Sequence, residues 1–191
     1  MKNFYIALVH APVYTRTGEV SATSVTHIDI HDIARTARTY GASGFYLVTP
    51  WKEQHELIKQ IIGYWNQDGV KSYHPDRSEA FEINRLVYTV EDMIEEITQK
   101  DGQKPWLIAT GAKERNDAPL PLSAAKILET INSIDFTQSV VLVLGTGWGL
   151  HESIFKLSDC VMDPIRGKGT YNHLSVRAAC AILCDRLFER D

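Results

Sequence analysis

A glycine-rich turn gives the sharpest chemical signal in the sequence. Gly145-Thr146-Gly147-Trp148-Gly149-Leu150 follows directly on an apolar run of strand length. Glycines tolerate positive φ and let main-chain amides come close to a ligand. A dinucleotide-binding fingerprint would read GxGxxG within a βαβ unit, but the spacing here is GxGxG and only about 40 residues follow. The turn therefore predicts a ligand site made of main-chain groups, with a plain turn that binds nothing as the alternative.

The loop 164–175 is the second candidate. It reads PIRGKGTYNHLS and leads from the last predicted strand into the last predicted helix. Its glycines and hydroxyl groups suit a segment that wraps a ligand, and the start of a helix offers free N–H groups. The helix region 174–188 is apolar over most of its circumference and rich in alanine. It must therefore be buried, either in the core or against a second subunit.

A helix with basic side chains is the third candidate. His31, Arg35 and Arg38 are spaced i, i+4 and i+7, so they share one face of the helix, away from its apolar stripe. This face is either functional or merely solvated, with an ion pair between Asp32 and Arg35.

Apolar runs of strand length alternate with helical patterns along the chain, which is typical of parallel βαβ units. Because the runs are almost continuously apolar, the strands should be buried on both faces. We expect strands at 4–10, 44–49, 85–90, 105–110, 139–145 and 160–163, and helices at 27–40, 51–65, 91–99, 123–133 and 172–189. Thr49 and Pro50 should cap and open the second helix, and Asn172 or Ser175 should cap the last. The polar stretches 66–80 and 113–121 are expected to be loops. The predicted class is α/β, a mostly parallel six-stranded sheet flanked by helices.

Composition fits an ordinary globular protein. The 191 residues, 44% hydrophobic and 23% charged, suit a single domain spanning 1–191. A formal charge of −4 argues against nucleic-acid binding by bulk electrostatics, although a local basic patch is compatible with it.

No run reaches the roughly 18 apolar residues of a membrane span, and no signal-peptide cleavage site follows the start, so we expect a cytoplasmic protein. Without a CxxC pair, three cysteines among apolar neighbours are expected to be reduced core thiols: Cys160, Cys180 and Cys184.

Histidines are also weighed as metal ligands. His27 and His31 flank Asp29, but no third ligand accompanies them at a known spacing, so no metal site is predicted.

Taken in order, the candidate segments resemble the three motifs of the trefoil-knotted (SPOUT) RNA methyltransferases, over most of the chain. The first motif of the 2′-O-ribose branch is matched by Arg35-Thr36-Ala37 and Gly41, with Asp29 in place of an Asn. LGTGWGL stands where the family has LGNEGxGL, and PIRGKG with LSVRAACAIL matches the third motif, a Pro-apolar-x-Gly loop before a Ser-Val-Ala-rich helix. A little-characterised bacterial branch, sometimes attached to tRNA (guanine-N1)-methyltransferases, is also similar. The acceptor atom is therefore left open between base and ribose.

The resemblance implies S-adenosylmethionine (SAM) as cofactor, tRNA or rRNA as partner, a homodimer and a C-terminal trefoil knot. It implies that Arg35 lies near the transferred methyl group, where His10 and Asp29 would help it. SAM should bind mainly to main-chain groups of turns at neighbouring strand ends: Thr110, Gly111, Ala112, Leu144, Gly145, Thr146, Gly147, Gly149, Leu150, Ile165, Gly167, Gly169, Tyr171, Asn172, His173 and Leu174. The alternatives are a noncatalytic SAM-binding module for RNA interaction or dimerisation, and an ordinary nucleotide-binding α/β enzyme.

Overall fold

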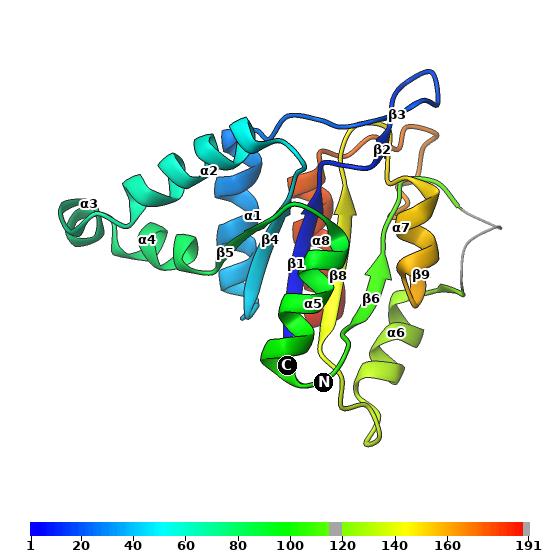
Figure 1. Cartoon of the computed structure of the whole chain (residues 1–191). Coiled ribbons are helices and arrows are strands. Elements are labelled where there is room, and N and C mark those ends of the chain that lie inside the picture. The colour runs from blue at the N-terminus through cyan, green and yellow to red at the C-terminus, as the bar shows by residue number, and fades with distance from the viewer. Residues whose placement is uncertain (115–119, 189–191) are drawn as a thin grey trace.

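One parallel sheet forms the centre of the protein, as seen in a computed structural model that describes residues 1–114 and 120–188. Its seven strands are ordered β5-β4-β1-β8-β6-β9-β7 (Figure 1). They are β1 (Phe4–Val9), β4 (Gly44–Val48), β5 (Asn84–Val87), β6 (Trp106–Ala109), β7 (Pro121–Leu122), β8 (Val140–Gly145) and β9 (Cys160–Met162).

The predicted α/β class and parallel sheet are confirmed, but the expected count of six strands is wrong. The seventh strand, β7, lies at the end of the stretch 113–121, for which the sequence predicts a loop. Residues 115–119 of that stretch lie outside the described residues. The trefoil knot stays a prediction.

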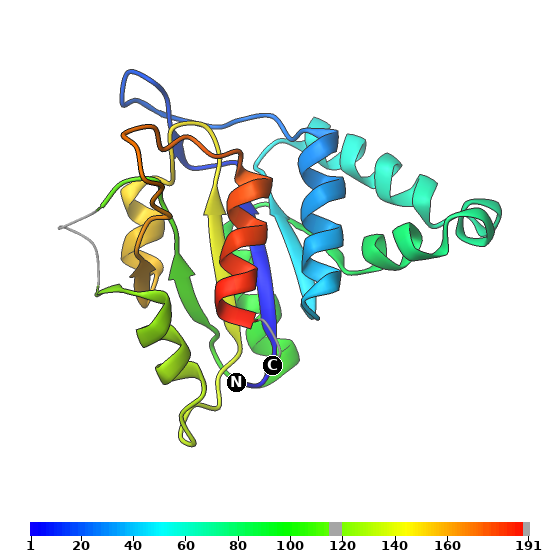
Figure 2. The same ribbon diagram turned by 180° about the vertical axis from the view of Figure 1, so that it is seen from behind.

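Helices cover both faces of the sheet (Figures 1 and 2). The first layer holds α1 (His27–Thr39), α2 (Lys52–Trp65), α4 (Pro75–Glu82), α6 (Ala124–Ile131) and α8 (Val176–Phe188), and the second holds α5 (Val90–Asp101) and α7 (Glu152–Leu157). Along β1, Ile6 and Leu8 join the core under the first layer, whereas Ala7 and Val9 join the core under the second. Since successive side chains of a strand point to opposite faces, burial on both faces requires a continuous apolar run.

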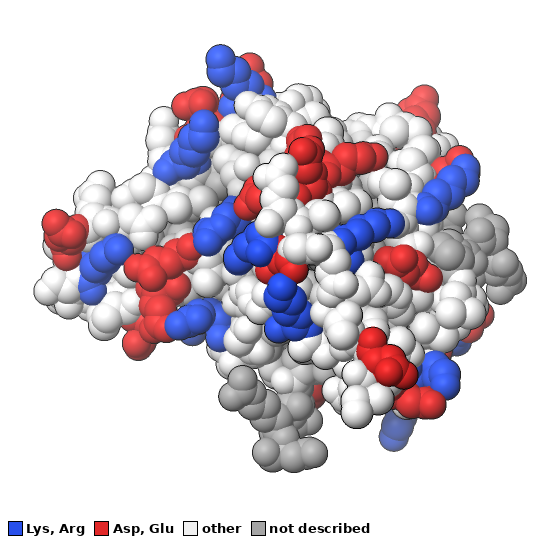
Figure 3. Space-filling model, turned by 60° about the horizontal axis from the view of Figure 1, so that its bottom comes forward, with Lys and Arg blue, Asp and Glu red and all other residues white. Residues whose placement is uncertain are grey.

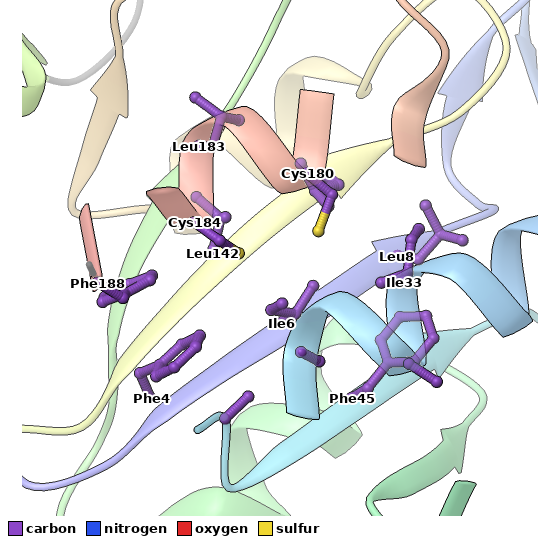
Figure 4. Packing of buried hydrophobic residues seen from close by; sticks show 14 of the residues in the cluster. Phe4, Ile6, Leu8, Ile33, Phe45, Leu142, Cys180, Leu183, Cys184 and Phe188 are labelled. Atoms are coloured by element: carbon purple, nitrogen blue, oxygen red, sulfur yellow. The ribbon is translucent and has the colours of Figure 1, made fainter. Parts of the chain in front are cut away.

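The last helix, α8, packs on β1 and β8 in the first layer (Figure 4). Its Phe188 ring stacks on Phe4 with ring centroids 3.9 Å apart. Cys180, Cys184 and Cys160 are free and fully buried, so the prediction of core thiols is confirmed. Burial raises the pKa of the Cys160 thiol to about 12, which keeps it protonated and unreactive at neutral pH.

Two short helices stand where a loop is expected at 66–80. They are α3 (Asp68–Tyr73) and α4, and they form a projection at the end of α2 on one side of the sheet (Figure 1). The sequence predicts a loop here because α3 buries no side chain and α4 has little amphipathic pattern. Tertiary contacts of Phe81, which is fully buried, hold α4 in place.

The basic face predicted on α1 is only partly solvated. The His31 ring makes edge contacts with Phe81 and Trp65, at centroid distances of 4.7 and 5.3 Å. Arg38 pairs with Glu79 of α4. The projection therefore covers part of the face that the spacing alone assigns to solvent.

Hydroxyl side chains cap several helices, but Thr49 does not. Its N–H donates to the Val87 carbonyl at 3.2 Å, which continues the pairing of β4 with β5, so Thr49 stays in the sheet and Trp51 is the residue before α2. Ser175, one of the two residues expected to cap the last helix, accepts from the N–H of Ala178 at 3.3 Å.

A buried carboxylate joins the end of α5 to the sheet. Asp101 is 5% exposed and accepts three hydrogen bonds: from Tyr5 at 2.9 Å, from Ser139 at 2.6 Å and from Asn3 at 3.0 Å. Each donor comes from β1, its approach or the residue before β8, so Asp101 ties α5 to the two central strands.

Charges of both signs are interspersed on the face drawn in Figure 3, without a large patch of one sign. Within residues 1–114 and 120–188, no helix is long and apolar enough to cross a membrane.

Candidate functional site

A large cavity opens at the carboxyl ends of β1, β6 and β8, the end of the sheet at the top of Figure 1. Its volume is about 1150 Å³. In parallel α/β sheets this is the edge at which ligands bind, because the loops that follow the strands meet there. The start of α1, the hairpin before it and the loop before α8 complete the walls.

Most residues predicted for the site line this one cavity. They are His10, Asp29, Thr110, Gly111, Ala112, Leu144, Gly145, Thr146, Gly147, Gly149, Leu150, Ile165, Asn172, His173 and Leu174. Gly167, Gly169 and Tyr171 belong to the loop before α8 but do not line the cavity, and neither does Arg35.

The glycine-rich turn is tightly fitted. A Cβ on Gly145 would lie 2.8 Å from Leu150 Cγ, closer than real contacts allow, and Gly147 and Gly149 have φ values of +58° and +108°. At all three positions only glycine fits without strain.

A two-stranded hairpin holds the turn from outside. It consists of β2 (Val13–Tyr14) and β3 (Val20–Ser21), which are too short to leave a recognisable pattern in the sequence. The N–H of Tyr14 donates to the Gly149 carbonyl at 2.9 Å, and the N–H of Trp148 donates back to the Tyr14 carbonyl at 3.1 Å. The turn is therefore anchored by main-chain bonds rather than left free at the surface.

A chain of hydrogen bonds fixes the proton on His10. Thr146 Oγ1 donates to the Val9 carbonyl at 3.0 Å, and Thr23 Oγ1 lies 2.5 Å from Thr146 Oγ1. Because the proton of Thr146 is already used, Thr23 must donate to Thr146. Thr23 can then only accept from His10 Nδ1, which lies 2.9 Å away. We infer that His10 carries its proton on Nδ1, which leaves Nε2 as an unprotonated acceptor.

His10 Nε2 is buried and has no hydrogen-bond partner among the residues that the structure describes. Burial lowers the pKa of His10 to about 4, although the nearby Asp29 carboxylate opposes this shift. At neutral pH the ring is therefore uncharged, and within the described parts of the chain no donor competes for the Nε2 lone pair of this cavity-lining residue.

Asp29 and Asp32 share one cation. Arg177 NH1 lies 3.3 Å from an Asp29 oxygen, and Arg177 Nε lies 3.3 Å from an Asp32 oxygen. The alternative of an Asp32–Arg35 ion pair is thus wrong, since Arg177 of α8 takes that place. Arg35 is exposed and forms no ion pair with any residue in the described parts of the chain.

Side-chain contacts connect the two long loops at the cavity. Asn172 Nδ2 donates to the Ala112 carbonyl at 2.7 Å, and Arg166 pairs with Glu114. The loop after β6 and the loop before α8 therefore close one side of the cavity together.

Several lining residues were not predicted from the sequence. They are Tyr14, Thr23, Ser24, Thr26, Lys113, Glu114, Phe155, Asp163, Val176, Ala179 and Leu183. Trp148 belongs to the predicted glycine-rich turn and lines the cavity with it. Asp163 lies directly before the predicted loop 164–175 and could have been included on that ground. Thr23 could not, since nothing local connects it to Thr146 and only the fold brings the two hydroxyl groups together.

Comparison with known proteins identifies the class of the fold. The chain superimposes on a SpoU methyltransferase from Streptomyces viridochromogenes, solved with AdoMet bound, with a TM-score of 0.56, 17% identity, and coverage of 98% of this chain and 58% of that chain. Residues 3–189 match the family described as SAM-dependent RNA methyltransferases. The chain belongs to this family.

Two relatives are more similar in sequence. A tRNA (guanine-N(1)-)-methyltransferase of Nitratidesulfovibrio vulgaris is 40% identical over 186 residues, which is 97% of this chain but 42% of that protein. An uncharacterized protein of Aquifex aeolicus is 36% identical over 190 residues, which is 100% of this chain and 90% of that protein. The chain thus spans less than half of the first relative and nearly all of the second.

The cavity has the features that SAM requires. Glycines let main-chain groups approach the ligand, as at Gly145, where any Cβ would collide with Leu150. Apolar side chains such as Leu144, Ile165 and Leu174 line it and can flank an adenine ring. The residues present therefore fit the cofactor of the family.

Proposed function

We propose that this chain methylates RNA in the cavity at the carboxyl ends of β1, β6 and β8. The observation that carries the proposal is that the second and third motif segments and Asp29 of the first line one cavity, including the glycine-rich turn whose geometry excludes side chains. Residues 110–112, 144–150 and the loop before α8 would hold SAM. When bound, SAM supplies an already activated methyl group, so the protein must chiefly align donor and acceptor.

His10 and Asp29 are proposed to assist loss of the acceptor proton. The free lone pair on His10 Nε2 suits a proton acceptor, and the fixed Nδ1–H keeps the ring in that tautomer. The Asp29 carboxylate would stabilise the charged ring, since it already favours the protonated form of His10. Asp29 is itself held by Thr26, which donates to it at 2.6 Å.

The substrate is proposed to be tRNA, because the first relative is named for a tRNA activity. That relative also contains sequence beyond the part this chain matches, so its guanine N1 specificity is not transferred to this chain. We propose a cytoplasmic location, where the free buried thiols would stay reduced.

Two measurements test the proposal together. SAM at about 100 times its dissociation constant stabilises a protein by roughly 2.7 kcal/mol, which corresponds to a rise in melting temperature of roughly 5 to 10 °C for a chain of this size. Incubation with methyl-labelled SAM and total bacterial RNA, followed by nucleoside mapping, should then label one nucleotide. A melting shift without labelled RNA would instead favour the noncatalytic SAM-binding module, and no shift at millimolar SAM would refute the site.

Arg35 is proposed to contact RNA phosphate from outside the cavity, since it is exposed and does not line the cavity. Arg35→Lys keeps the charge but loses the paired N–H groups that grip phosphate, so single-turnover methylation should slow by roughly tenfold. Arg38→Lys on the same helix is the matched control, because Arg38 is paired with Glu79. Equal methylation rates for wild type and Arg35→Lys would contradict the RNA contact and show that Arg35 is only a solvent-exposed side chain.

A homodimer is proposed, formed through the outer face of α8. The helix and the start of α1 have accessible apolar residues that do not line the cavity: Ala178, Ala181, Ile182 and Ile28. Light scattering at micromolar concentration should give twice the chain mass of 21.6 kDa. A species that remains at 21.6 kDa would contradict the dimer.

A further inference from the structure

Trp148 is an exposed indole on a rigid support. It is 58% exposed, whereas Leu150, two residues later in the same turn, is 1% exposed. The glycines on both sides of it have positive φ, and its own N–H is bonded to the Tyr14 carbonyl. The backbone of the turn thus holds the indole at the surface at little further cost in conformational entropy.

The indole also borders the cavity. Trp148 lines it together with Tyr14 and Lys113. Val20, which pairs with Tyr14 across the hairpin, is 59% exposed, so the hairpin bonded to the turn carries a second exposed apolar side chain. A flat, exposed aromatic surface that lines a cavity together with a lysine suits a planar base attached to a phosphate backbone.

The volume of the cavity and the net charge of the protein favour binding of an RNA base at Trp148, in addition to SAM. The cavity of about 1150 Å³ exceeds the usual range of roughly 300 to 1,000 Å³ for a site that holds one small molecule. A net charge of −4 provides little general attraction for RNA, so stacking and local contacts must supply affinity. Enzymes that modify a nucleotide commonly take the base out of its stack and hold it against an aromatic side chain.

We propose that Trp148 stacks on an unpaired base of the RNA substrate and so selects single-stranded or extruded nucleotides. This inference rests on the proposed function of the cavity. Trp148 is assigned here to substrate binding, whereas SAM is held by the glycines around it. The contact is tolerant of base identity, because every base has a flat face.

Binding of short RNA tests the proposal directly. The probes are a ten-nucleotide adenosine RNA and an abasic strand with the same number of phosphates, measured by fluorescence polarisation of an end label. Wild type should prefer the strand with bases. Trp148→Leu, which keeps apolar bulk but cannot stack, should weaken binding of the adenosine strand roughly 5- to 150-fold and leave the abasic strand unchanged. Trp148→Phe should retain most of the affinity.

Three controls keep the test decisive. SAM affinity of Trp148→Leu should match wild type, and so should its oligomeric state. Trp51→Leu, at a 40% exposed tryptophan outside the cavity, should bind the adenosine strand as wild type does. Wild-type affinity in Trp148→Leu, equal loss for the abasic strand, loss of SAM binding or loss of the dimer would each overturn the assignment.

Failure of this inference differs from failure of the proposed function. If wild type labels RNA with methyl groups and Trp148→Leu does so with the same KM, the stacking role is wrong and the methyltransferase stands. If wild type labels no RNA, the proposed function itself fails.

Discussion

Replacing Asp101 with alanine is expected to lower the free energy of unfolding by about 3 to 5 kcal/mol. The carboxylate accepts hydrogen bonds from Tyr5, Ser139 and Asn3, and its loss leaves the Tyr5 and Ser139 hydroxyl groups without their partner inside the protein. Urea denaturation monitored by circular dichroism measures the change. Asp135→Ala, at an exposed carboxylate, is the control and should stay within about 0.5 kcal/mol of wild type.

The same carboxylate makes stability depend on pH in a defined direction. Burial alone would raise the pKa of Asp101, but hydrogen bonds from Ser139, Tyr5 and Asn3 and the charge of Lys100 outweigh it, so the pKa is lowered from 3.8. The stabilisation is therefore complete above the unfolded-state pKa and is lost as pH falls through the lower folded-state pKa. The stability gap between wild type and Asp101→Asn should be constant near neutrality and narrow below pH 3.8. A gap that does not change in acid would contradict this account.

His10→Ala is expected to slow single-turnover methylation at least about 100-fold, the lower limit for losing a positioned acid–base group. Because burial lowers the pKa of His10 to about 4, the lone pair on Nε2 stays available throughout the neutral range. The His10-dependent rate should therefore be flat near neutral pH and fall only in acid.

Thr146→Val separates the role of the tautomer from that of the ring. This variant removes the hydroxyl that makes Thr23 an acceptor for His10 Nδ1–H, so the proton can move to Nε2 in part of the molecules. We expect an intermediate rate, with the SAM affinity of each variant measured separately. If His10→Ala methylated RNA at the wild-type rate, His10 would have only a structural role in the cavity wall and would not accept the proton.

Much of the fold is predictable because the strands of a parallel sheet are buried on both faces and therefore require apolar residues at nearly every position. The six longer strands lie where those runs are. The hairpin β2–β3 and strand β7 are missed because each strand has two residues, fewer than any hydrophobic period needs. Helix α4 is missed because the contact of its Phe81 with His31 of α1, rather than its own pattern, stabilises it. Helix α3 is missed because it buries no side chain and so has no apolar pattern.

The site is predictable where it depends on the local backbone and unpredictable where it depends on tertiary contacts. Glycine spacing indicates the turn at 145–150 because backbone conformation there is a local requirement. Arg177 pairs with Asp29 across 148 residues of sequence, and Thr23 meets Thr146 across 123. Pairs so distant follow from strand order, which spacing along one sequence does not reveal.

The central place of β1 has a consequence for synthesis on the ribosome. One edge of β1 pairs with β4 soon after it is made, but the other edge pairs with β8, and the partners Val9 and Gly145 are 136 residues apart. At a translation rate of about 5 to 20 residues per second, the edge of β1 that pairs with β8 stays unpaired for roughly 7 to 27 seconds. An unpaired, fully apolar strand edge is a template for association with other chains. Nascent chains of this protein should therefore depend on chaperones during this interval more than chains whose first strand lies at a sheet edge.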